Sequence, residues 1–164
     1  MADSVIEILS QYTSNSYMLI VLISMIPVIE SRGSIPYGIL VLGLPWYKVA
    51  IVSIIANFLI TIPIVYLLEP AYIRLSRFHM FKRFFDWLFA RSRKKGRVID
   101  RLKVLGLIVF VGIPLPITGA WTGCVAAYLF GLKKSHTLIG IFFGILLSVL
   151  IISSLSLTGM AILN

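Results

Sequence analysis

Residues 17–44 read YMLIVLISMIP, then VIESRGSIP, then YGILVLGL, and this interrupted apolar stretch decides the fold. Its longer arm has 11 residues, which is ~16 Å of helix and about half of a ~30 Å hydrocarbon core. Proline removes a helical hydrogen bond and glycine loosens the backbone, so Pro27, Gly33 and Pro36 mark an irregular tip. The pattern predicts a re-entrant helical hairpin, which enters the membrane and returns to its own side.

A second interrupted stretch follows the same plan. Residues 104–132 read VLGLIVFVGIP, then LPITGAWTG, then CVAAYLFGL, with Pro114, Pro116, Gly119 and Gly123 near the centre. Irregular backbone at membrane depth is stable only where protein buries it or where it lines a water-filled cavity. We therefore expect the two tips to meet inside the protein.

The composition places the chain in a membrane. Of 164 residues, 59% are hydrophobic and 13% are charged, against roughly half and a quarter in a soluble domain. Uninterrupted apolar stretches at 46–68 and 137–163 each exceed the ~20 residues that span a bilayer. The first cation is Arg32, so no cleaved signal peptide is expected. These features exclude a soluble enzyme.

The positive charge is concentrated in one loop. Net charge is +9, and 11 of the 15 Lys and Arg residues lie between Arg74 and Lys103. Cations crowded between apolar stretches predict a cytoplasmic loop rather than a nucleic-acid partner. Aromatic residues recur at helical spacing over 72–89, which favours a helix at the headgroups over one that packs on a soluble domain. The run RSRKKGR predicts contacts with anionic lipid through Arg91, Arg93, Lys94, Lys95 and Arg97.

The two halves of the chain resemble one another. Placing Pro27 on Pro114 aligns ISMIP with FVGIP and, after one inserted residue, ILVLGL (39–44) with AYLFGL (127–132). A hairpin plus one spanning helix crosses the membrane an odd number of times, so tandem copies must be inverted. We predict one all-α polytopic membrane domain over 1–164, with repeat 1 at 1–69, a basic cytoplasmic segment at 70–103, repeat 2 at 104–164, and both termini outside. Each repeat comprises an amphipathic helix, a re-entrant helical hairpin and a transmembrane helix.

Glu30 and Arg32 are the only full charges in the two interrupted stretches. A charge at membrane depth costs at least ~2.5 kcal/mol, so it is paired, hydrated or functional. Glu30 suits a proton or a cation, and Arg32 presents a donor fork for phosphate or carboxylate. The structural alternative is an internal Glu30–Arg32 pair that pins the tip.

The second tip has no charge, but its half-helix ends can supply partial charge to a site at the midplane. The alternative is a structural turn in which Trp121 only packs. On the spanning helices Asn57, Ser53, Thr61 and Ser148 either line the cavity or, more commonly, join helices by hydrogen bonds. The candidate residues for substrate or ion binding are Glu30, Arg32, Ser34, Pro36, Asn57, Pro114, Pro116, Thr118, Gly119, Trp121 and Thr122.

The remaining motifs give weaker indications of function. His79 and His136 lack acidic or thiol partners at ligand spacing, so we expect no metal and no cofactor. Cys124 is interpreted as a small core residue. Gly140 and Gly144 form a small-residue step for close helix contact, within the chain or between copies.

The tip ESRGSIP (30–36) with YGILVLGLP (37–45), and the later GIPLPITGAWTG (112–123), resemble the bacterial and archaeal small multidrug export proteins over about residues 17–150. That family is similar in architecture to DedA-type proteins, whose paired re-entrant hairpins are associated with polyprenyl-phosphate lipids and proton-linked transport. The resemblance implies a transporter in the cytoplasmic membrane of a prokaryote. Thr118 and Gly119 stand where DedA-type arginines are expected, which argues against a phosphate lipid.

The expected function is an integral membrane exporter of small molecules that works by alternating access and proton coupling at the paired tips. Glu30 would accept the proton or cation, and Arg32 would act as gate or anion partner. The alternatives are a translocase for polyprenyl phosphate or phospholipid, and a non-transporting protein that organises partners through its basic loop. Because the chain is short, a homodimer is expected.

Overall fold

A computed structural model describes residues 13, 15–75, 97–115 and 118–163, and every regular element in these residues is a helix. The two longest helices have 30 residues each and are apolar enough to cross a membrane. This confirms the all-helical class and the two long apolar helices. In chain order the elements are α2 (Ser16–Met25), α3 (Glu30–Pro36), the π-helix η1 (Tyr37–Val41), α4 (Trp46–Leu75), α6 (Arg97–Gly112), α7 (Ala120–Leu129) and α8 (Lys134–Leu163).

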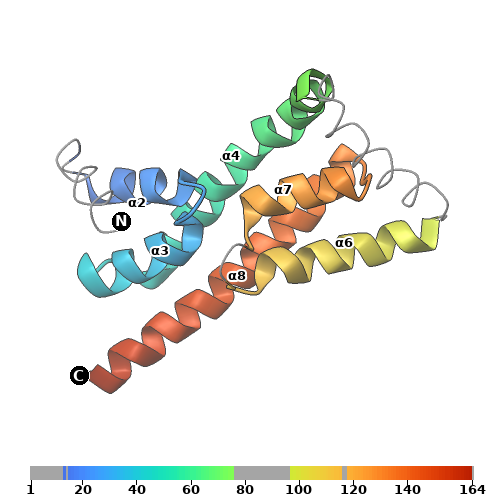
Figure 1. Cartoon of the computed structure of the whole chain (residues 1–164). Helices are drawn as coiled ribbons and strands as arrows, with labels where there is room; N and C mark the ends of the chain where they lie inside the picture. The colour runs from blue at the N-terminus through green and yellow to red at the C-terminus, as the bar shows by residue number, and fades with distance from the viewer. Residues whose placement is uncertain (1–12, 14, 76–96, 116–117, 164) are drawn as a thin grey trace.

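Short helices pack in pairs beside the two long ones (Figure 1). A turn at residues 26–29 joins α2 to α3, and residues 113–119 join α6 to α7. Asn15 caps α2, since its side chain accepts hydrogen bonds from the amides of Tyr17 and Met18. α2 and α7 have 10 residues each, or ~15 Å, which is too short to cross a bilayer.

Each pair of short helices ends in the same way. Gly43 and Gly131 have φ of +61° and +67°, a left-handed conformation that glycine adopts without steric cost. The next amide turns back in both cases, from Leu44 to the Gly38 carbonyl at 2.9 Å and from Leu132 to the Ala127 carbonyl at 3.0 Å. The chain thereby reverses into α4 in the first half and into α8 in the second.

The expected irregular tips are shorter in the structure. Helix α3 starts at Glu30, so Gly33 and Pro36 lie in a helix, and the expectation of irregular backbone there was wrong. Gly33 serves packing, because a Cβ at this position would lie 2.1 Å from Cγ2 of Ile29. Pro36 cannot donate a helical hydrogen bond, and the following turn widens into η1. Gly123 is likewise inside α7.

Glycines allow α6 to pack closely on α8. A Cβ at Gly140 would lie 2.9 Å from Leu107, and one at Gly144 would lie 2.6 Å from Val111. The small-residue step is therefore used within the chain. Cys124 is fully buried in the same core, as interpreted.

Several predictions fall outside the described residues. These are the amphipathic stretches beyond Leu75 and before the first hairpin, the lipid contacts of Arg91, Arg93, Lys94 and Lys95, and Pro116. Arg97 begins α6, but its side chain also lies outside the description.

Candidate functional site at the two tips

The Glu30 carboxylate crosses from the first tip to the second. It is 5% exposed, and it accepts hydrogen bonds from the backbone amides of Ala120 and Trp121, each at 3.2 Å. These amides are at the N-terminus of α7, where unpaired N–H groups and the helix dipole attract an anion. Glu30 therefore caps a helix that begins 90 residues later in the chain.

The backbone of Glu30 is strained in this position. Its φ is +49°, the only positive value at a non-glycine among the described residues. Such a conformation costs about 1–3 kcal/mol and persists where the surroundings hold it. Here the Glu30 amide donates to the Ile26 carbonyl at 2.9 Å, while the carboxylate is held by α7.

Gly119 leaves room for the carboxylate. A Cβ at this position would lie 2.6 Å from Oε2 and 2.7 Å from Oε1 of Glu30. A side chain at position 119 would move the Glu30 carboxylate away from the two backbone amides that donate to it. Glycine at 119 is thus required by the approach of Glu30.

Arg32 binds the other end of the same break. Its Nη1 donates to the Leu115 carbonyl at 2.5 Å, and Nη2 donates to Thr118 Oγ1 at 3.0 Å and to the Ile113 carbonyl at 3.4 Å. Carbonyl groups that follow the last turn of a helix carry partial negative charge. Arg32 therefore binds the chain just beyond the C-terminal end of α6, whereas Glu30 binds the N-terminal end of α7.

Glu30 and Arg32 do not form an ion pair with each other, so the structural alternative of an internal Glu30–Arg32 pair is not what the structure shows. Residues two apart on a helix point to opposite sides, and α3 begins at Glu30. Each charge instead finds a backbone partner in the second tip. The charged tip and the uncharged tip are thus electrostatically complementary.

A layer of buried polar side chains lies behind Glu30. The Asn57 amide donates to Ser31 Oγ at 3.5 Å and is near enough to the Glu30 carboxylate to interact with it. Ser34 Oγ accepts from Ser24 at 2.8 Å and is 2.9 Å from Ser53 Oγ. The Ser34 hydroxyl therefore joins α2, α3 and α4, and it does not face the second tip.

Most predicted residues meet at this junction, and a few do not. Thr122 is exposed and its hydroxyl donates to the Gly119 carbonyl of its own turn. Pro36 lies at the far end of α3, and Pro114 lies between the two carbonyls that accept from Arg32. The structure brings together Glu30, Arg32, Asn57, Thr118, Gly119 and Trp121.

Sequence reasoning missed the groups that hold the charges. The acceptors of Arg32 include the carbonyls of Ile113 and Leu115, and one donor to Glu30 is the Ala120 amide. Backbone groups have no signature of their own in the sequence. Ser31 could have been found, because it stands between the two charges and would be expected to share their burial.

Three buried polar atoms around the junction have no hydrogen-bond partner in the described residues. They are Oδ1 of Asn57, Nε1 of Trp121 and Nε of Arg32. Buried polar groups in proteins are nearly always paired. The junction therefore has two donors and one acceptor, besides the Glu30 carboxylate, to offer to a solute or to water.

Comparison with known proteins identifies the family. A family model described as "Putative small multi-drug export protein" matches residues 30–151, which is 122 of the 164 residues and includes Glu30, Arg32 and the whole second tip. No curated protein and no solved structure matched the chain. The chain therefore belongs to the small multi-drug export protein family, and this family and the two long apolar helices make it a membrane protein.

Proposed function

We propose that the protein is an integral membrane transporter that exports small molecules by alternating access at the two tips. The family supports the transporter class. The observation that carries the mechanism is the Glu30 carboxylate on the N-terminus of α7, because it joins the two halves of the chain by a contact that a proton can break.

Proton coupling follows from the chemistry of that contact. The ionised carboxylate accepts two charge-assisted hydrogen bonds, which are stronger than bonds between neutral groups. Protonation or cation binding removes the charge and weakens the hold on α7. A guanidinium stays ionised at every physiological pH, so Arg32 continues to hold the end of α6. Arg32 is then the pivot and Glu30 the releasable gate.

The helix arrangement supports two repeats that rock against each other. Each half has a pair of packed short helices, a Gly-Leu reversal and one long apolar helix. The short helices are those expected of re-entrant hairpins, and inverted repeats with broken helices at the midplane are typical of secondary transporters. The distribution of Lys and Arg supports a cytoplasmic basic segment with both termini outside.

The surroundings of the protein complete the proposal. Exposed apolar side chains on α4 and α8, among them Leu59 and Leu155, suit lipid contact. We place the protein in the cytoplasmic membrane of a prokaryote as a homodimer, with the cations of residues 91–97 on anionic headgroups. A dimer would enlarge the wall of a cavity that one short chain can supply.

Transport into proteoliposomes tests this mechanism. Purified protein is reconstituted, a pH gradient is imposed, and uptake of ethidium, tetraphenylphosphonium and an anionic dye is measured. Glu30→Gln and Arg32→Ala should each lower gradient-dependent uptake, whereas Lys48→Gln, which removes an exposed charge at the start of α4, should not. Unchanged uptake of every probe in both tip variants would refute the assignment. Leaflet exchange of a labelled polyprenyl phosphate that weakens in Arg32→Ala would instead identify a lipid translocase.

A further inference from the structure

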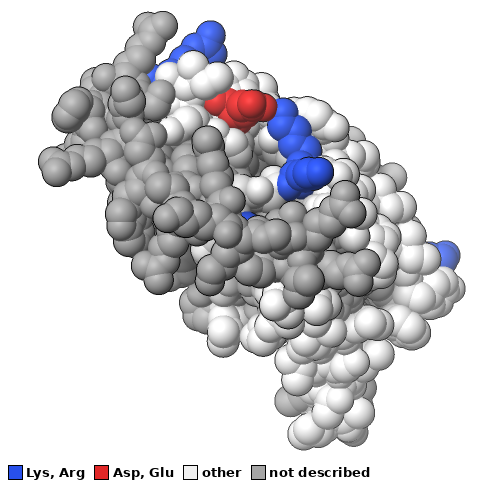
Figure 2. All heavy atoms as spheres, turned by 90° about the vertical axis from the view of Figure 1, so that its right-hand side faces the viewer, with Lys and Arg blue, Asp and Glu red and all other residues white. Residues whose placement is uncertain are grey.

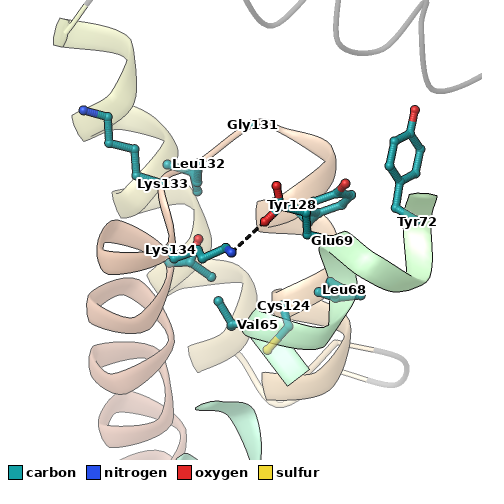
Figure 3. Close-up of a pocket in the computed structure, with 11 residues that line it drawn as sticks. Val65, Leu68, Glu69, Tyr72, Cys124, Tyr128, Gly131, Leu132, Lys133 and Lys134 are labelled. Carbon is teal, nitrogen blue, oxygen red and sulfur yellow. Dashed lines mark hydrogen bonds and ion pairs between the residues drawn. The ribbon is translucent and has the colours of Figure 1, made fainter. Parts of the chain in front are cut away.

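A cavity of about 480 Å³ opens between the end of α4, the second half of α7 and the start of α8 (Figure 3). Buried Val65, Cys124 and Thr137 are among the residues that line it. The tilted rings of Tyr72 and Tyr128, with centroids 5.6 Å apart, stand on its wall. The interior therefore suits an apolar or aromatic group.

An ion pair between the two long helices lies at this cavity. Lys134 Nζ is 2.6 Å from Oε2 of Glu69 and 5.3 Å from the centroid of the Tyr66 ring. A carboxylate and an aromatic face are the two groups that together recognise an ammonium ion. The ammonium group of the chain itself thus occupies a site built for a cation.

The lysine is held loosely in this site. The side chains of Lys134 and Glu69 are 44% and 53% exposed, and exposed ion pairs contribute little free energy because water and salt compete for both partners. Figure 2 shows acidic and basic side chains next to each other on the surface of the molecule. A ligand that also fills the cavity can therefore displace the lysine.

The direction of the neighbouring side chains favours a cation over an anion. Lys133 and Lys134 both line the cavity, but only Lys134 points to Glu69, and the ammonium end of Lys133 is directed away from that carboxylate (Figure 3). An anion near Glu69 would meet Lys134 already neutralised by that carboxylate, and the carboxylate would repel it. A cation would meet Glu69 and the tyrosine rings, while Lys134 can turn to water.

We propose that this cavity binds an organic ammonium ion with an aromatic or branched apolar body, which takes the place of Lys134 on Glu69 and Tyr66. The cavity reaches Cys124, four residues along α7 from the Ala120 amide that holds Glu30, or ~6 Å at 1.5 Å per residue. A role of this cavity as the loading site of an exporter rests on the proposed function. The binding of an ammonium ion in the cavity does not depend on that function.

Calorimetric titration of the purified protein in phosphatidylcholine nanodiscs tests the proposal. The probes are phenylbutyltrimethylammonium and phenylbutanesulfonate, which share one apolar body and differ in the sign of the charge. We expect the ammonium probe to bind. Glu69→Gln should weaken its binding about tenfold or more, and Lys134→Met should tighten it several-fold because the tethered competitor is gone. Lys48→Met, at an exposed lysine of α4 that does not line the cavity, is the matched control and should change the affinity by less than about twofold.

Each outcome decides the matter. The double variant Glu69→Gln with Lys134→Met should bind as weakly as Glu69→Gln alone. Binding of the sulfonate that is lost in Lys134→Met and tightened in Glu69→Gln would overturn the proposal in favour of an anion site. Absence of ammonium binding in both the native protein and Lys134→Met, with the nanodisc protein monodisperse, would also overturn it. This assay does not read transport, so its failure leaves the role of Glu30 standing, and failure of the uptake assay leaves this site standing.

Discussion

The Ala120 amide donates a 3.2 Å hydrogen bond to the Glu30 carboxylate, so one buried acid of the first helix pair caps the N-terminus of a helix in the second pair. Arg32 binds the chain just after the preceding helix, through the carbonyls of Ile113 and Leu115. One turn of α3 thus supplies the counter-charges for both ends of the break between α6 and α7. The Glu30 contact is one of several that join the two halves, and it is the one that protonation of a carboxylate would weaken.

Gly119→Ala should lower the stability of the protein. The new Cβ would lie 2.6 Å from Oε2 of Glu30, and overpacking of this kind costs about 1–3 kcal/mol. Thermal unfolding in detergent should show a lower midpoint. Gly159→Ala on α8 is the control, since nothing lies within 4 Å of its Cβ and alanine favours a helix. An equal midpoint for the Gly119 variant and native protein would contradict the close approach of the carboxylate.

Gly144→Leu should separate α6 from α8. A Cβ alone would already lie 2.6 Å from Val111, so the larger side chain cannot be accommodated without moving a helix, at a cost of about 3 kcal/mol or more. We expect loss of monodisperse protein in size-exclusion chromatography. Gly106→Leu, at an open position of α6, should leave the elution profile unchanged. If both variants behave alike, the two helices are not in close contact through this glycine.

Glu30→Gln should release the start of α7. The amides of Ala120 and Trp121 lose a charged acceptor, and neutral hydrogen bonds are roughly half as strong as charge-assisted ones. Hydrogen exchange measured by mass spectrometry should rise in peptides that cover 118–124. Arg32→Lys should instead raise hydrogen exchange in peptides that cover 113–115, because an ammonium group lacks the planar fork of a guanidinium. Peptides from the middle of α4 provide the internal reference, and a uniform rise there would indicate global loosening instead.

Asn57→Leu should separate a role in transport from a role in packing. The Asn57 side chain makes one long hydrogen bond at 3.5 Å, and its Oδ1 has no partner in the described residues. Leucine has the same number of side-chain heavy atoms and the same branching as asparagine, so it should change the free energy of unfolding by less than about 1.5 kcal/mol, whereas gradient-dependent uptake should fall markedly. Ser53→Ala removes the contact with Ser34 and should cost about 1 kcal/mol of stability with uptake retained. The reverse pattern would make Asn57 a packing residue.

The local sequence was sufficient to predict the helical elements and the positions of the turns that interrupt the two apolar stretches. The apolar stretches at 46–68 and 137–163 predicted the two long helices, because length and hydropathy decide whether a helix can span a membrane, although α4 continues to Leu75 and α8 begins at Lys134. Pro27 and Pro114 marked the two turns. Gly33 and Pro36 were misleading, because both lie within α3. A glycine that serves close packing, as Gly33 does, looks the same in a sequence as one that serves a turn.

The sequence by itself determined that this is an all-helical membrane protein with one charged tip and one uncharged tip, because these properties depend on composition and on the spacing of residues along the chain. Only the tertiary structure decided that Glu30 and Arg32 bind separate helix ends rather than each other, and that Glu69 meets Lys134 over a cavity. These contacts join residues at least 65 positions apart, and several use backbone amides and carbonyls. Every residue other than proline has both of those groups, so their role is set by where a helix begins or ends in space.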